Sequence, residues 1–172
     1  MGTKIADVMT QRPRAVTLQT SVREAARLMD EEDVGSLPVV EEGARLVGIV
    51  TDRDIAVRVV GRGLDPNATV VRDVASTDVV ALNPDHDLDE ALTLMARERV
   101  RRVPIVVGEY ELVGMIAQAD IAHAGKEKAT GEVVEAISRK RGGPRVAGPA
   151  EGSRSNVGRG ESPPEEKDRP SR

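Results

Sequence analysis

The most constraining feature of this sequence is a duplication at a fixed offset. Three segments of the first half return 66 positions later in the same order, with apolar, acidic, proline and glycine residues at matching places. The matching pairs are residues 22–29 with 88–95, 34–40 with 100–106, and 46–55 with 112–121. Such self-similarity indicates supersecondary units that bury apolar faces against each other. We expect two such units, at residues 8–58 and 74–124, because one unit alone buries too little surface to be stable.

Each unit is predicted to run in the order β-α-β-β-α. Ser21 with Glu24, and Asp87 with Glu90, have the spacing of capping boxes at helix starts. Apolar side chains then recur at helical spacing, and a turn-separated pair of short aliphatic strands follows each helix. The expected strands are residues 15–18, 37–40 and 46–50 in the first unit, and 79–82, 103–107 and 112–116 in the second. The predicted fold class is therefore mixed α/β, with two repeats packed together.

The C-terminal part of the chain is predicted to be different. Residues 126–140 have the pattern of one short helix. From position 141 to 172, Gly, Pro, Ser and charged residues dominate and apolar periodicity is lost. A segment with so little apolar surface cannot offset the entropy of ordering, so we expect residues 141–172 to be disordered.

Composition narrows the possible functions. The chain has no Cys, Trp or Phe, and its formal net charge is −4. Residues 139–172 carry nine Lys or Arg and five Asp or Glu, so residues 1–138 carry 16 basic and 24 acidic side chains, a net of −8. An acidic body with a single aromatic residue, Tyr110, argues against nucleic acid as a partner. No apolar run has the length of a membrane span and no secretory signal is evident, so we expect a cytoplasmic protein.

The repeated segments resemble the CBS family. Residues 48–55 and 114–121 are similar to the signature that ends a CBS motif, and residues 35–39 and 101–105 fit the same family. The arrangement is similar to short stand-alone bacterial proteins with one CBS pair. This resemblance implies a pseudo-twofold pairing of the repeats, two clefts between them, a homodimer, and an adenosine-type ligand such as AMP, ADP, ATP or S-adenosylmethionine. It implies a regulatory role with no required cofactor. The residues themselves argue against an enzyme and a metal site, because no nucleophile elbow, P-loop or Rossmann glycine run is present and His86 and His123 lack metal-ligand spacing; we therefore expect no catalytic residues and no metal.

Thr51 and Asp54 are the leading candidate site residues. In a purely structural interpretation, Thr51 is a helix N-cap and Asp54 is an acid in the first helical turn. Taken functionally, the Asp54 carboxylate accepts hydrogen bonds from two ribose hydroxyls. In the second copy Asp120 is retained, but Ala117 replaces the hydroxyl residue, which predicts a weaker second site.

Further candidates come from the resemblance. Arg101 and Arg102 lie where the family often places a phosphate contact, although they also fit a solvated surface pair, and Arg53 is equally ambiguous. Val16 and Leu37 suit either an adenine pocket or an ordinary core, and Ser36 and Pro38 belong to the same segment.

Three functional hypotheses remain open at this stage. The leading one is a nucleotide-sensing module that signals to an unknown protein partner by a conformational change. The alternative is a ligand-free dimerisation or adaptor protein, which Ala117 and the lack of an attached effector domain favour. A third is nucleic-acid binding through the basic C-terminal tail.

Overall fold

The computed structural model describes residues 2–138, without the side chains of residues 126–128. The chain divides into a unit of residues 1–140 and a unit of residues 141–172. The predicted disorder of residues 141–172 lies outside the described residues. No helix within residues 2–138 is long and apolar enough to cross a membrane.

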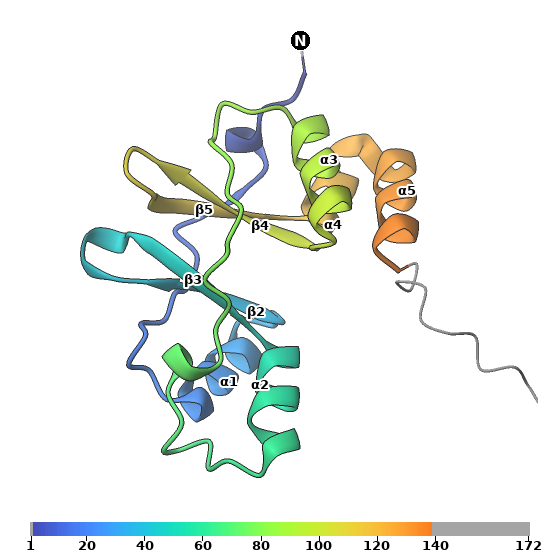
Figure 1. Cartoon of the computed structure of the whole chain (residues 1–172). Coiled ribbons are helices and arrows are strands. Elements are labelled where there is room, and N and C mark those ends of the chain that lie inside the picture. The colour runs from blue at the N-terminus through green and yellow to red at the C-terminus, as the bar shows by residue number, and fades with distance from the viewer. Residues whose placement is uncertain (1, 139–172) are drawn as a thin grey trace, which may run out of the picture. The chain divides into compact units, whose positions relative to one another are not determined.

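Residues 2–138 contain two similar repeats, each with a helix, a β-hairpin and a second helix (Figure 1). The first repeat comprises α1 (Val22–Glu31), β2 (Ser36–Val40), β3 (Leu46–Thr51) and α2 (Asp52–Arg58). The second comprises α3 (Leu88–Glu98), β4 (Arg102–Val107), β5 (Glu111–Ala117) and α4 (Gln118–Ile121). The helix α5 (Glu127–Ser138) follows and packs on α3. The mixed α/β class is confirmed.

The first strand predicted for each repeat is shorter than expected. Val16 forms a single parallel bridge to Val39, and Leu82 forms one to Ile105. The ladder cannot extend toward residue 14 because the next bond would need an amide N–H at Pro38, which proline lacks. Pro104 has the same effect in the second repeat. The prolines that belong to the repeat pattern therefore prevent these ladders from extending upstream of the bridge.

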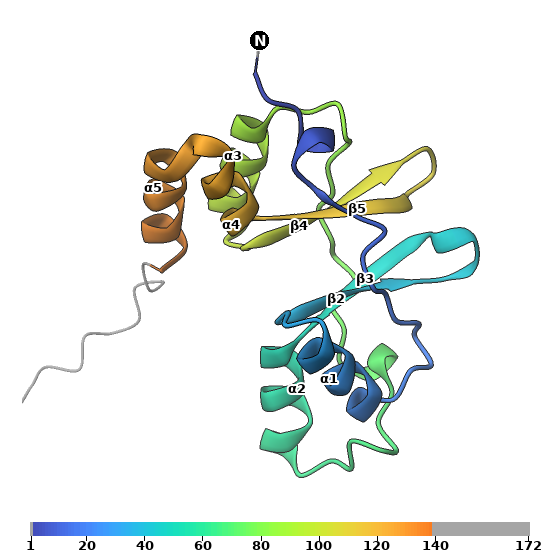
Figure 2. The ribbon, with the colours of Figure 1, turned by 180° about the vertical axis from the view of Figure 1, so that it is seen from behind.

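The segment that precedes each repeat packs on the other repeat. The short 3₁₀ helix η1 (Ile5–Asp7) and strand β1 (Thr10–Gln11) lie on the second repeat, where β1 pairs antiparallel with β5. In the reciprocal arrangement, η4 (Val71–Asp73) lies on the first repeat and Ser76 bridges Ile49 of β3. Figure 2 shows the N-terminal segment crossing β5 first and then passing β3 on its way to α1.

We call the segment that contains η1 and β1, and the segment that contains η4 and Ser76, the two exchanged segments. Their backbone hydrogen bonds match at the 66-residue offset. Ile5 N donates to the carbonyl of His86, as Val71 N donates to that of Thr20. The exchange places Ile5 in the core of the second repeat and Val71 in the core of the first, and both are fully buried. Lys4 is also bound to the second repeat, because its ammonium lies 3.0 Å from Asp87, and this hydrogen bond raises the pKa of Lys4.

The apolar stripes of the two repeat-starting helices form these cores. Val22 and Met29 are buried in the first core, and Leu88 and Met95 in the second. These stripes are therefore covered within one chain, and a homodimer would have to use another surface. The exchanged segments and the hairpins already cover them.

Candidate functional site

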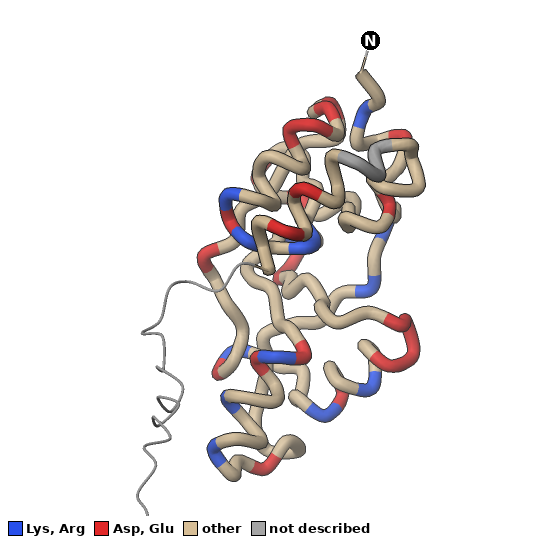
Figure 3. Tube along the Cα trace, turned by 90° about the vertical axis from the view of Figure 1, so that its right-hand side faces the viewer, with Lys and Arg blue, Asp and Glu red and all other residues tan. Residues whose placement is uncertain are grey.

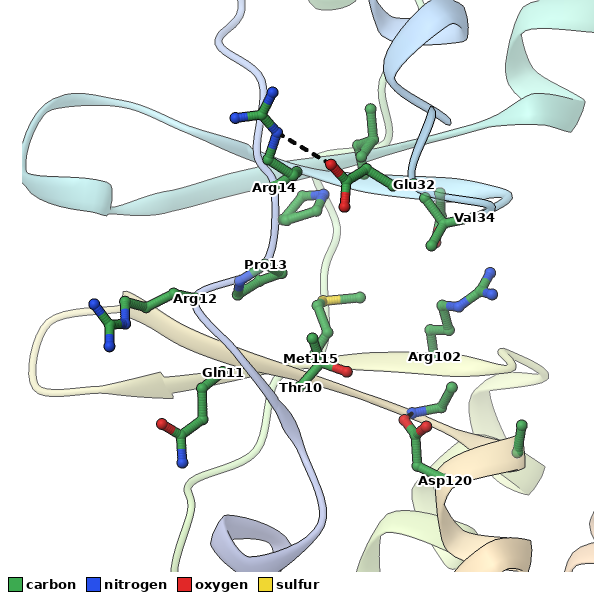
Figure 4. A pocket seen from close by; sticks show the side chains of 15 residues that line it. Thr10, Gln11, Arg12, Pro13, Arg14, Glu32, Val34, Arg102, Met115 and Asp120 are labelled. Carbon is green, nitrogen blue, oxygen red and sulfur yellow. Dashed lines mark hydrogen bonds and ion pairs between the residues drawn. The ribbon is translucent and has the colours of Figure 1, made fainter. Parts of the chain in front are cut away.

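The first cleft lies between the repeats and has a volume of about 550 Å³. Residues 10–14 of the exchanged segment form one wall, and residues 34–38 of the first repeat form another. The second repeat contributes Arg102, Met115 and Asp120 (Figure 4). We call this space the Asp120 cleft.

Asp120 presents a carboxylate with spare acceptor capacity. Its Oδ2 accepts a hydrogen bond from the backbone N–H of Ala117 at 2.8 Å, which caps α4. Ala117 has no hydroxyl to donate, and Ala124 stands where the first repeat has Arg58. Among the residues whose side chains the structure describes, 2–125 and 129–138, the backbone N–H is the carboxylate's only hydrogen-bond donor. The remaining lone pairs can therefore accept from a ligand.

Arg102 extends from β4 toward the first repeat. Its guanidinium Nη1 lies 3.7 Å from the point that a Cβ on Gly35 would occupy, so it reaches the first repeat's backbone. Its side chain is half-buried and has no ion-pair partner in the described part of the chain. An unpaired guanidinium in a cleft can donate several parallel hydrogen bonds to an anion, with phosphate the best match.

The other charged side chains of this cleft are either ion-paired or directed away from Arg102 and Asp120. Arg14 pairs with Glu32 at 3.3 Å. Arg12 extends away from the end of the cleft that holds Arg102 and Asp120 (Figure 4). Apolar surface from Val34 and Met115 lies between the charged groups, and such surface suits the face of an aromatic base.

The second cleft is smaller, with a volume of about 240 Å³. It is lined by Thr51 and by side chains from both repeats, among them Asp78, Glu98 and, again, Arg102. We call it the Thr51 cleft. Its volume is below the roughly 300–1,000 Å³ of typical small-molecule pockets, whereas the Asp120 cleft lies within that range.

Asp54 serves mainly as a helix cap. Its Oδ2 accepts from the backbone N–H of Thr51 at 3.0 Å and from the Thr51 hydroxyl at 2.7 Å, while Thr51 Oγ1 accepts from Asp54 N. Its Oδ1 lies 3.6 Å from Arg58, and the side chain is 14% exposed. Asp54 is not among the residues that line the Thr51 cleft. This geometry favours the Asp120 cleft as the more open acceptor, the reverse of the order expected from the sequence.

The other candidates divide in the same way. Ser36, Leu37 and Pro38 line the Asp120 cleft beside Asp120 and Arg102. Val16 is buried in the first core at 3% exposure, so its position fits the core interpretation. Arg53 and Arg101 are exposed and line neither cleft.

Sequence reasoning missed the charged residues that the exchanged segments and helix ends bring in. These are Arg12, Arg14 and Glu32 in the Asp120 cleft, and Asp78 and Glu98 in the Thr51 cleft. A signal was present, since Ile5 and Val8 recur at the same 66-residue offset as Val71 and Val74. Following the repeat upstream to these residues would have marked both segments as parts of the fold.

The described part of the chain lacks the surface features typical of nucleic-acid and metal binding. Figure 3 shows acidic and basic residues interspersed along both halves of the described chain, with no continuous basic stripe in that view. Among residues 2–138 no group of three or more His, Cys, Asp or Glu side chains could hold a metal ion.

Comparison with known proteins decides the family. The CBS domain family matches residues 5–61 and 71–127, which are the two repeats with their exchanged segments. The chain belongs to the CBS domain family. No catalytic family is indicated for it, and CBS pairs are typically regulatory modules.

Its relatives are small CBS proteins. It is 43% identical over 118 residues to the CBS domain-containing protein YhcV of Bacillus subtilis, covering 69% of this chain and 82% of that protein. Hypoxic response protein 1 of Mycobacterium tuberculosis is 36% identical over 135 residues, covering 78% of this chain and 94% of that protein.

Two solved CBS structures show different ligands. A crystal structure of Hypoxic Response Protein I with two coordinated zinc ions has a TM-score of 0.65 at 35% identity, covering 70% of this chain and 98% of that one. The structure of CBSX2 in complex with AMP has a TM-score of 0.64 at 26% identity, covering 74% and 98%. Shared CBS architecture therefore does not by itself define what this chain binds.

Proposed function

We propose that this protein is a non-enzymatic regulatory module that binds a phosphorylated adenosine nucleotide in the Asp120 cleft. The observation that carries the proposal is the pairing of two unsatisfied groups in one cleft of about 550 Å³: the open carboxylate of Asp120 and the unpaired guanidinium of Arg102. A nucleotide supplies a complement to each, because ribose hydroxyls donate hydrogen bonds and phosphate oxygens accept them.

Each part of the ligand has a counterpart in the cleft. The two ribose hydroxyls donate to Asp120, and the phosphate accepts from Arg102. The base packs against the apolar surface that Val34, Leu37 and Met115 contribute. The complex of CBSX2 with AMP, a protein of similar fold, supports this class of ligand.

The position of the cleft suggests how binding becomes a signal. Its walls come from both repeats, so a ligand there bears on their relative arrangement. A ligand that binds one arrangement more tightly shifts the population toward it, and a protein partner that distinguishes the arrangements responds. The module needs no chemistry of its own to act in this way, and we place it in the cytoplasm.

Calorimetric titration of the full chain with AMP, ADP, ATP and S-adenosylmethionine tests the proposal. We expect saturable binding of at least one adenosine phosphate, accompanied by an increase in thermal stability. If none of the four binds, nucleotide sensing is excluded and the adaptor function takes its place.

We also propose that the protein is a homodimer. Val57, Val60 and Leu64, on α2 and the loop after it, are 53%, 70% and 46% exposed. Three large apolar side chains exposed on neighbouring turns favour an interface with a second copy. Sedimentation should give about twice the 18.4 kDa of one chain, and V60E should shift the distribution to the monomer. A monomeric wild type would rule this out.

A further inference from the structure

The two clefts differ in charge, although they are related by the repeat. Arg12, Arg14 and Arg102 line the Asp120 cleft together with Glu32 and Asp120, which is a formal net charge of +1. Arg102 lines the Thr51 cleft together with Asp78 and Glu98, which is a formal net charge of −1. The repeat offset explains the contrast, because Asp78 and Val80 stand where the first exchanged segment has Arg12 and Arg14.

The existing ion pairs reduce this contrast but keep its direction. Arg14 and Glu32 neutralise each other in the Asp120 cleft, so Arg12 and Arg102 remain against Asp120. Near the Thr51 cleft, Glu98 pairs with Arg97 at 2.6 Å, but Asp78 is exposed and has no partner within residues 2–138.

The cations nearest to the Thr51 cleft in sequence do not compensate. Arg58 is engaged, since it donates to the carbonyl of Val74 and lies 3.6 Å from Asp54. Arg53 is exposed and does not line the cleft. Arg102 is therefore the only cation among the residues that line it.

Arg102 is shared, which makes the two clefts unequal. It lines both of them, while its repeat partner, 66 positions earlier, is Ser36. One guanidinium that binds a phosphate in the Asp120 cleft is not available to a second phosphate. A ligand in the Thr51 cleft then faces Asp78 and Glu98 with no free cation.

We propose that the Thr51 cleft selects an adenosine ligand that carries no phosphate, with Asp78 and Glu98 as the residues that exclude phosphate. This inference rests on the proposed function and extends it to a second ligand class. A phosphomonoester carries about −1.5 to −2 charges at neutral pH, so the two carboxylates repel it, whereas an uncharged nucleoside meets no such repulsion. The chain then holds one nucleotide and one nucleoside at the same time.

Calorimetry with AMP and adenosine tests this at low ionic strength, where charge effects are least screened. We expect the wild type to bind one AMP per chain. Protein saturated with AMP should still bind one adenosine per chain. In D78R/E98Q, which replaces the repulsion with a cation, a second AMP should bind at least tenfold more tightly than any second AMP event in the wild type.

D30R/E109Q is the matched control. It makes the same change in charge at two exposed residues that line neither cleft, and it should keep one AMP per chain. Asp78 is exposed and Glu98 pairs only with exposed Arg97, so D78R/E98Q should unfold at close to the wild-type temperature. If that variant is less stable, D78N alone replaces it in the test. D78N should then bind the second AMP at least threefold more tightly than the wild type does.

The outcomes separate this inference from the proposed function. Two AMP per wild-type chain, no adenosine bound beside AMP, or a second AMP event unchanged in D78R/E98Q and D78N would each overturn the charge selection while leaving nucleotide binding intact. Absence of both AMP and adenosine binding in the wild type would instead overturn the proposed function itself.

Discussion

At the residue scale, the two repeats differ in how many neighbours bind the Asp carboxylate at the start of their second helix. The turn geometry around that carboxylate is the same in both. In both repeats an Asp carboxylate accepts the N–H at the start of a helix. In the first repeat the Thr51 hydroxyl and Arg58 add further contacts, so that Asp54 is largely satisfied within its own helix. In the second repeat both additions are replaced by alanine, and Asp120 keeps its acceptors for a ligand.

Arg102→Met tests the proposed phosphate contact. Methionine keeps much of the apolar stem but removes the charge, and hydrogen bonds to charged groups contribute about 1.5–3 kcal/mol. AMP should therefore bind at least about tenfold more weakly, since 1.4 kcal/mol corresponds to one decade. Adenosine has no phosphate and should bind within about twofold of wild type. Equal losses for both ligands would show that Arg102 acts on the cleft's structure and not on the phosphate.

At the scale of helices and strands, the signature glycines Gly48 and Gly114 have a steric role. A Cβ on Gly114 of β5 would lie 2.5 Å from Met9 Sδ and 3.2 Å from the carbonyl of Thr10. A Cβ on Gly48 of β3 would lie 3.0 Å from the carbonyl of Ser76. Both glycines stand where an exchanged segment crosses a hairpin, so they permit the crossing that builds the clefts.

Gly114→Val should lower the free energy of unfolding by about 1–3 kcal/mol, because two more methyl groups are forced against Met9 and Thr10. Gly131→Val is the control, since nothing lies within 4 Å of a Cβ at that helical position. It should change stability by less than about 0.5 kcal/mol. Urea denaturation of the two variants measures the difference, and equal stability would contradict the steric role.

Much of the secondary structure could be predicted from the sequence, because it depends on local patterns. The capping residues Ser21 and Asp87 each directly precede the first residue of a helix, and the four hairpin strands lie within one residue of their predicted bounds. The exchanged segments could not be predicted in this way. Ile5 and Val71 are single apolar residues in one-turn 3₁₀ helices, which carry no periodicity.

The candidate site was less predictable than the fold for a similar reason. Thr51 and Asp54 match the family pattern better, but whether a carboxylate is free depends on neighbours such as Arg58, four residues further along α2. The charges of Arg12 and Asp78 reach the clefts only because the segments that carry them are exchanged.

The two repeats form one interdependent structure at the whole-molecule scale. Each core contains residues from the segment that precedes the other repeat, with Ile5 in the second core and Val71 in the first. Loss of either segment exposes the core of a repeat and removes a wall of a cleft. We therefore expect residues 2–138 to unfold in one cooperative transition.

Ile5→Ala should destabilise the protein by about 2–5 kcal/mol, because it leaves a cavity in the second core. The control, Val134→Ala, truncates a side chain that is 41% exposed and lies outside the proposed dimer interface, and it should change stability by less than about 0.5 kcal/mol. Calorimetric unfolding should show one transition that shifts as a whole in Ile5→Ala. Two separated transitions would show that the repeats are independent.

The central claim, that the Asp120 cleft is the nucleotide site, is tested most directly by titrating AMP calorimetrically into wild type, D120N and D54N. Asparagine keeps the size of each side chain and an oxygen for the helix cap, but it removes the charge that the ribose hydroxyls would meet. The account predicts that D120N weakens AMP binding at least about tenfold, while D54N stays within about twofold of wild type. The opposite result, with binding lost in D54N and kept in D120N, would contradict it.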